Sequence, residues 1–121
     1  MAWQFNQHEP VFLQISNRLR AEILCGKYPP DTQIPSVRQL ASEAAVNPNT
    51  MQRALSQLEE EGILHSHGTL GRFVTSDVEV LERAREEMRR KTVRMWLEEA
   101  KSLNIPTEKI IQYIKEEERK I

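Results

Sequence analysis

The sequence has little of what several classes of protein require. It contains one cysteine, which cannot form an internal disulfide, so a disulfide-stabilised secreted scaffold is excluded. No apolar run approaches the roughly 18 residues of a membrane-spanning helix. Residues 1–6 lack the basic start and the apolar stretch of a signal peptide. We therefore expect a cytoplasmic protein.

The sequence also lacks an excess of either charge. Its 17 Lys and Arg residues are balanced by 18 Asp and Glu residues, whereas nucleic-acid-binding domains are commonly basic. Three of the acidic residues are consecutive, at 59–61, so the net charge still allows a basic surface elsewhere. We recognise no nucleophile–base pair, phosphate-binding loop or carboxylate dyad, and an enzyme is therefore not expected.

Apolar periodicity predicts a first helix over Pro10–Cys25. Proline suits the first position of a helix, and Gly26 suits a left-handed C-cap that would end it. The apolar residues recur three or four positions apart and so share one face: Phe12, Ile15, Leu19 and Ile23.

Two shorter helices are predicted after a rigid connector at 28–35, which contains three prolines. Ser36 is the expected N-cap of the first helix, while Asn47 and Pro48 are the expected N-cap and first residue of the second, which ends near Gly62. The apolar faces consist of Val37, Leu40 and Ala41 in the first helix and Met51, Ala54, Leu55 and Leu58 in the second. Two short helices, the second with a polar leading edge, are typical of a helix-turn-helix.

A hairpin is predicted directly after the second of these helices. Ile63–Ser66 and Arg72–Thr75 are β-like runs, and the loop 67–71 between them contains two glycines. A hairpin behind a recognition helix is a wing, so the order of elements is that of a winged-helix domain. The expected fold class is α+β and mostly α, with a winged helix-turn-helix at 1–76 and a two-helix dimerisation segment at 77–121.

The C-terminal segment is predicted to form a long helix at Val78–Leu103 and a last helix capped by Thr107. Two helices alone have little to pack against, so their apolar stripes imply a partner, most economically a second copy of the chain. For Trp96, contact with a small effector is the alternative to a role in the dimer core. The residues expected at the dimer interface are Leu81, Ala84, Met88, Met95, Trp96, Ile110 and Ile114.

Two segments resemble a known family. Gly26–Ala41 resembles the signature of GntR-type regulators, and Val46–Leu55 is similar to the recognition helix of their YtrA-like subgroup. The resemblance implies a dimeric DNA-binding repressor whose two C-terminal helices serve dimerisation. The sequence departs from the family pattern at Asp31, where the family has glycine, and in the wing, where the first glycine is at 68 rather than 69. Since aspartate tolerates left-handed geometry, we expect the turn at Asp31 to persist.

Polar residues crowd the start of the helix that begins at Pro48, the end that would enter the major groove of DNA. Asn and Gln side chains can pair bidentately with adenine, and Arg with guanine or phosphate. This pattern and the family resemblance together predict which residues contact DNA. They are Arg38, Asn47, Asn49, Thr50, Gln52 and Arg53 in the two helices, and His67, Gly68, Thr69 and Arg72 in the wing. The alternatives are that Asn47 only caps its helix, that Arg38 pairs with Glu43, and that the others are solvated surface.

His65 and His67 share one face of a predicted strand, a spacing that could start a metal site. With one cysteine and no third clustered ligand, we expect neither a metal nor another cofactor. The cysteine, Cys25, is expected to be a small buried apolar residue.

Together these features predict a sequence-specific transcriptional regulator, a repressor, that binds a near-palindromic operator as a homodimer. The main alternative is a winged-helix adaptor that binds only other proteins. The near-neutral charge favours the adaptor, whereas the polar recognition helix and Arg38 disfavour it. In a third hypothesis, a small effector binds between the wing domain and the C-terminal helices.

Overall fold

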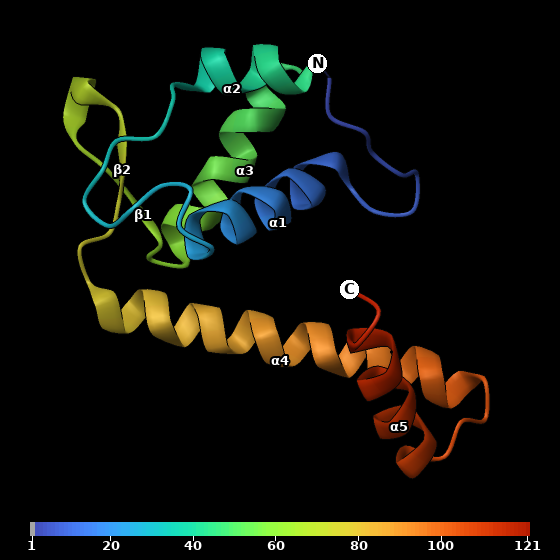
Figure 1. Cartoon of the computed structure of the whole chain (residues 1–121). Coiled ribbons are helices and arrows are strands. Elements are labelled where there is room, and N and C mark those ends of the chain that lie inside the picture. The colour runs from blue at the N-terminus through green and yellow to red at the C-terminus, as the bar shows by residue number, and fades with distance from the viewer. Residues whose placement is uncertain (1) are drawn as a thin grey trace. The chain divides into compact units, whose positions relative to one another are not determined.

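The computed structural model describes residues 2–121 and has the predicted order of elements (Figure 1). The elements are α1 (Val11–Leu24), α2 (Val37–Ala44), α3 (Pro48–Glu60), β1 (Leu64–Ser66), the 3₁₀ turn η1 (Gly68–Leu70), β2 (Arg72–Val74), α4 (Val78–Ser102) and α5 (Thr107–Glu118). Three helices followed by a hairpin confirm the predicted winged helix. The chain divides into two compact units, one ending at Arg85 and the other spanning Glu86–Ile121, so the division falls inside α4.

The core of the first unit lies where α1 packs against α3. The apolar stripes of the two helices meet there, and Ser16 Oγ donates a hydrogen bond of 3.2 Å to the Ala54 carbonyl, which satisfies a buried hydroxyl. The predicted stripes are confirmed apart from Phe12, which is half-buried. The residues with no more than 1% of their surface exposed include Ile15, Leu19, Leu40, Met51, Ala54, Leu55 and Leu58.

The end of α1 is closed by a Schellman motif. Gly26 has a φ of 96°, as its predicted C-cap role requires, and the Lys27 N–H donates to the Glu22 carbonyl over 2.9 Å. Cys25 is exposed, so the expectation that it is buried is wrong. It lies two positions beyond the buried Ile23, about 200° around the helix, and therefore on the opposite side.

Both helices of the helix-turn-helix begin at the predicted caps. Ser36 Oγ accepts from the Gln39 N–H, and the Gln39 side chain accepts from the Ser36 N–H, which forms a capping box. Asn47 Oδ1 accepts from the Asn49 N–H at 2.7 Å, and Pro48 is the first residue of α3. Side chains adjacent in sequence therefore set the positions where both helices begin.

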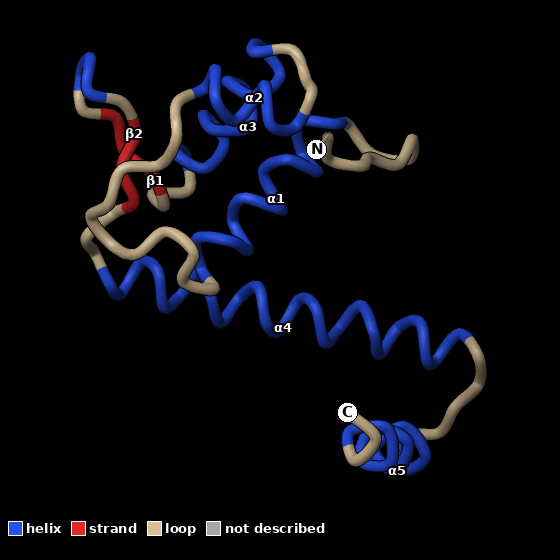
Figure 2. The backbone as a smooth tube through the Cα atoms, turned by 45° about the horizontal axis from the view of Figure 1, so that its top comes forward, coloured by secondary structure: helices blue, strands red, loops and turns tan. Residues whose placement is uncertain are grey.

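The hairpin is widened by the connector that precedes α2. Strands β1 and β2 are antiparallel, and Leu64 lies opposite Val74. On the other edge of β2, the Asp31 N–H donates to the Val74 carbonyl and the Ile34 N–H to the Arg72 carbonyl, both over 3.0 Å. Figure 2 shows this connector running beside the two strands. Asp31 has a φ of 65°, so the left-handed turn expected there is confirmed.

Helices α4 and α5 leave most of their apolar side chains exposed. In α5 no residue is buried, and Trp96 and Met95 of α4 are 65% and 59% exposed. Thr107 is the first residue of α5 rather than its cap, which corrects the prediction, because Pro106 occupies the N-cap position; Thr107 Oγ1 instead accepts from Lys101 Nζ over 2.8 Å. Within residues 2–121, none of the helices combines the length and the hydropathy needed to cross a membrane.

The Ser36 cap gives a first testable prediction. The substitution Ser36→Ala removes the acceptor for the Gln39 N–H and should lower the free energy of unfolding by about 1 kcal/mol. The matched control is Ser42→Ala, since Ser42 is an exposed residue inside the same helix, and it should change stability little. Urea unfolding at one fixed protein concentration measures both variants, and equal losses would contradict the capping role.

Candidate nucleic-acid interface

The leading edge of α3 presents polar side chains to solvent. Asn49, Gln52 and Arg53 are exposed and Thr50 is half-buried, whereas Met51 is fully buried. This separation follows from the helical period, because the residues that pack on α1 leave the opposite side of α3 outward. The structure thus brings together the polar residues that the sequence predicted for this helix.

Asn47 acts as the N-cap of α3, and this cap reduces the number of free backbone N–H groups at the start of the helix. Pro48 has no N–H group, and the Asn49 N–H is already bonded to Asn47 Oδ1. The Thr50 and Met51 N–H groups donate to the Asn47 carbonyl. The start of α3 therefore has few free backbone donors for an anion, and its exposed polar side chains are the main hydrogen-bonding groups there.

Arg38 lies in the first turn of α2, exposed and close in sequence to the Ser36 cap. Within the described part of the chain it forms no ion pair, so the alternative pairing with Glu43 is not seen. A free guanidinium at the start of a helix suits phosphate, because the positive end of the helix dipole adds to its charge.

Arg53 is held differently. Its guanidinium carbon lies 3.8 Å from the centroid of the Phe12 ring, a cation–π contact between α3 and α1. The sequence predicts a DNA contact for Arg53 and a core position for Phe12. In the structure the two side chains cover each other at the surface, so Arg53 has a structural partner inside the fold.

The wing tip is a tight loop held by a residue from the connector. The His67 N–H donates to the Gly71 carbonyl over 2.9 Å, and Gln33 Nε2 donates to the Leu70 carbonyl. Gly71 has a φ of 111°, and a Cβ there would lie 2.9 Å from Gln33 Nε2. The loop exposes His67, Gly68 and Thr69. Gln33 was not among the predicted site residues, because nothing in the local sequence indicates a partner in the wing.

Three rings stiffen the wing below its tip. The His65 and His67 rings are 5.0 Å apart between centroids, and Phe73 lies 5.2 Å from His67 and 6.2 Å from His65. The predicted shared face of the two histidines is therefore confirmed. In residues 2–121 no group of three or more His, Cys, Asp or Glu side chains is arranged to hold a metal ion.

Arg72 is drawn into a network that joins the wing to α3. Its Nε donates to Glu59 Oε1, and its Nη1 donates to Gln52 Oε1 over 3.4 Å. Ser66 Oγ donates to the other carboxylate oxygen of Glu59 over 3.2 Å. The Arg72 side chain is only 13% exposed. We call these four residues, Gln52, Glu59, Ser66 and Arg72, the wing–helix network.

The acidic run at the end of α3 is largely used inside the fold. Glu59 belongs to the wing–helix network, and Glu61 receives two hydrogen bonds from Arg20 of α1, of 2.7 and 2.5 Å. Paired carboxylates project less negative potential than free ones. The overall net charge of the chain is therefore a poor guide to the charge at the leading edge of α3.

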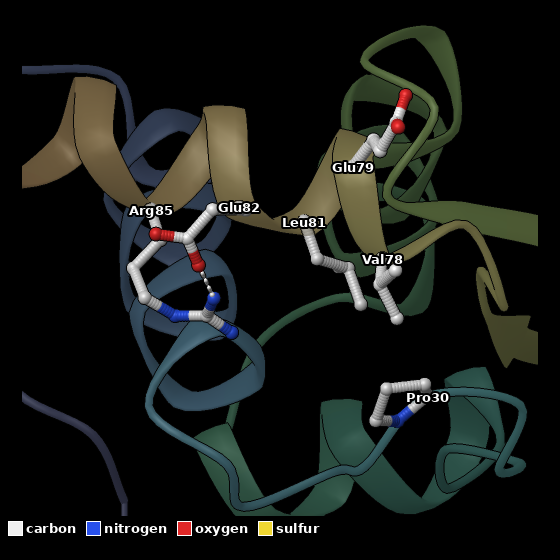
Figure 3. Close-up of a pocket in the computed structure, with 6 residues that line it drawn as sticks. All are labelled: Pro30, Val78, Glu79, Leu81, Glu82 and Arg85. Atoms are coloured by element: carbon white, nitrogen blue, oxygen red, sulfur yellow. Dashed lines mark hydrogen bonds and ion pairs between the residues drawn. The ribbon is translucent and has the colours of Figure 1, made fainter.

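A pocket of about 320 Å³ lies between the connector and the first turns of α4. Figure 3 shows Val78 and Leu81 pointing toward Pro30, while the Glu79 carboxylate points away. Arg85 at its rim donates to Glu82 and to the Leu24 carbonyl over 2.8 Å. Leu81 is only 4% exposed, so this residue, expected at a dimer interface, has little surface left for a partner.

Comparison with protein families and curated proteins gives consistent matches. The model of the bacterial regulatory proteins of the gntR family matches residues 12–74. The chain is 29% identical over 112 residues to the uncharacterized HTH-type transcriptional regulator YhcF of Bacillus subtilis, covering 93% of each chain. It is also 29% identical over 108 residues to the HTH-type transcriptional repressor YtrA of the same organism, covering 88% of this chain and 83% of YtrA.

Solved structures show the same similarity. A GntR family transcriptional regulator from Listeria monocytogenes superposes with a TM-score of 0.86 at 32% identity, covering 93% of this chain and 98% of that one. The DNA-binding domain of AraR, solved in complex with the operator ORX1, superposes with a TM-score of 0.57 at 25% identity, covering 62% of this chain and 95% of that domain.

The geometry of the wing tip gives a second prediction. The substitution Gly71→Ala forces a Cβ against Gln33 and an unfavourable φ, so it should open the tip and speed hydrogen exchange of the His67 amide by about tenfold. Exchange of the Leu19 amide in the core should not change. Gly68→Ala is the matched control, because Gly68 also has a positive φ, of 51°, but a Cβ there would meet open space. Similar exchange at His67 in both variants would contradict the proposed constraint.

Proposed function

Because the chain belongs to the GntR family of bacterial transcriptional regulators, we propose that it binds operator DNA as a homodimer through α3 and the wing. The relatives named above are HTH-type regulators, and the AraR domain of similar fold is bound to an operator. Occupying a promoter in this way would block transcription, as the word repressor in the name of YtrA suggests. Such a protein acts in the cytoplasm, where the DNA is.

One observation carries the proposal. Asn49 and Gln52 are exposed amide side chains on the leading edge of α3, and the exposed Arg38 of α2 forms no ion pair with any residue that the structure describes. Amides suit base edges in the major groove, and a free guanidinium suits phosphate. The residues we propose for direct contact with DNA are Arg38, Asn49, Thr50 and Gln52, together with His67, Gly68 and Thr69 in the wing. Asn47 caps α3, Arg53 stacks on Phe12, and Arg72 is considered below.

The homodimer is supported by the apolar surface of the second unit. Trp96, Met95 and Ile114 are 65%, 59% and 56% exposed, which is unusual for side chains of this size in a stable monomer. We propose that these residues, with Met88 and Ile110, pack against the same surface of a second chain, since a two-fold interface is self-complementary. Ala84 and Leu81 belong to the first unit, and Leu81 is already buried there.

A two-fold dimer determines the form of the operator. Two copies of α3 would enter successive major grooves on one side of the duplex, so the operator should be near-palindromic. Its half-site centres should lie about one helical turn, or a multiple of it, apart. Each wing would then contact the backbone or minor groove beside its half-site.

DNA binding is tested by fluorescence anisotropy with the intergenic DNA upstream of the gene for this chain and a scrambled duplex. We expect selective binding that weakens by about a hundredfold or more between about 50 and 200 mM salt. Arg38→Ala should reduce the slope of log affinity against log salt by about 1, because it removes a phosphate contact. The control Arg94→Ala removes the same charge from α4 and should retain the slope. Absence of binding to either duplex at low salt would instead favour a protein–protein adaptor.

The dimer is tested separately by sedimentation equilibrium. The chain should have twice its 14.1 kDa mass, and Trp96→Glu should shift it toward the monomer, because a buried unpaired carboxylate is costly. The Trp96 variant should also lose affinity for the operator, since each half-site is then bound singly. Val78→Glu places the same charge on an exposed apolar residue of the first unit and should leave the mass doubled. A wild-type chain that sediments as a monomer would contradict the proposal.

A further inference from the structure

The wing–helix network includes a hydrogen bond to Gln52, an exposed amide on the leading edge of α3. Gln52 and Glu59 are two helical turns apart on one side of α3, and Arg72 from β2 bridges them. Glu59 is itself fixed, because each of its oxygens accepts a hydrogen bond, one from Arg72 and one from Ser66. The guanidinium therefore has a defined position, and so does the amide that it contacts.

This contact determines which polar atom of Gln52 faces outward. The two polar atoms of an amide diverge from one carbon, so when Oε1 points to Arg72 Nη1, the Nε2 group points away from the wing. Gln52 is exposed, and Nε2 forms no hydrogen bond within the part of the chain that the structure describes. The side chain thus turns its hydrogen-bond donors toward its surroundings, while its oxygen, with one of its two lone pairs engaged, faces the wing.

We propose that Arg72 is a positioning residue for base recognition, and that it makes Gln52 read guanine rather than adenine. Bidentate pairing of glutamine with adenine uses both the amide oxygen and the amide nitrogen, whereas guanine presents two acceptors, O6 and N7, in the major groove. An amide that turns its oxygen toward the wing and its Nε2 donors outward therefore fits guanine better than adenine. This inference rests on the proposed function, because it requires α3 to lie in the major groove.

The same geometry separates Arg72 from an ordinary phosphate contact. A phosphate would have to draw the guanidinium away from Glu59, with which it forms an ion pair, and the side chain is only 13% exposed. Arg38, by comparison, is exposed and unpaired among the described residues. Arg72 therefore contributes to sequence preference through Gln52, while Arg38 contributes to affinity through the DNA backbone.

The test is a selection of bound duplexes from a random library with the full-length chain and its variants. Gln52→Ala identifies the base pair that Gln52 reads, since preference is lost there, and the wild-type chain should select G·C at that pair. Arg72→Lys retains the charge but loses the rigid pair of donors that reaches both Glu59 and Gln52. It should relax the same base pair, accept A·T there, and lower affinity for the selected site about tenfold.

Matched controls separate positioning from charge and from folding. Arg90→Lys makes the same substitution in α4 and should give the wild-type base preferences. For Arg72→Lys the slope of log affinity against log salt should equal that of the wild type. Loss of a phosphate contact would instead reduce this slope. Where thermal unfolding shows that Arg72→Lys does not fold, Glu59→Gln is used instead, because it weakens the hold on Arg72 without changing the size of the side chain; it should relax the same base pair.

Three results would overturn the inference. The wild-type chain could select A·T at the pair read by Gln52, or the Arg72→Lys chain could keep the wild-type preference there. The salt slope of Arg72→Lys could also fall as it does for Arg38→Ala. In each case the wild-type chain still selects DNA, so the proposed function stands and only the inference fails. A wild-type chain that selects no sequence overturns both.

Discussion

The packing of α3 against α1 is the constraint on which the rest of the structure depends. Met51, Ala54 and Leu58 have no exposed surface, and the buried Ser16 hydroxyl is bonded to the Ala54 carbonyl at the centre of this contact. With one face of α3 buried, its helical period leaves Asn49 and Gln52 facing solvent. The side chains available for recognition therefore follow from the core rather than from any independent feature of the surface.

Of the arginines that precede α4, all but Arg38 have a partner inside the fold among the residues that the structure describes. Arg20 pairs with Glu61, Arg53 stacks on Phe12, and Arg72 joins Glu59 and Gln52, whereas Arg38 is exposed and free among the described residues. This division explains how a chain with 17 basic and 18 acidic residues can belong to a family of DNA-binding regulators. The carboxylates of Glu59 and Glu61 at the end of α3 are paired with arginines, so the net charge of the chain does not describe the leading edge of that helix.

The features predicted correctly from the sequence are those whose causes are local. The caps at Ser36 and Asn47 and the left-handed turn at Asp31 each depend on neighbouring residues, so the sequence was sufficient. The partners of Gln33 and Arg72 are distant in sequence and could not be found in this way, because a single sequence contains no information on which polar residues meet. The sequence predicts a single interface along the apolar stripe of α4, but the first turns of this helix belong to the first unit, where Leu81 is buried.

Methylation protection by dimethyl sulfate tests the central claim, that α3 lies in the major groove of DNA, most directly. This reagent modifies guanine N7 in the major groove and adenine N3 in the minor groove, so it distinguishes the two grooves. The account predicts that the bound chain protects guanine N7 in two clusters whose centres lie about one helical turn, or a multiple of it, apart. Protection confined to adenine N3, or a selectively bound duplex with no protected guanine N7, would contradict it.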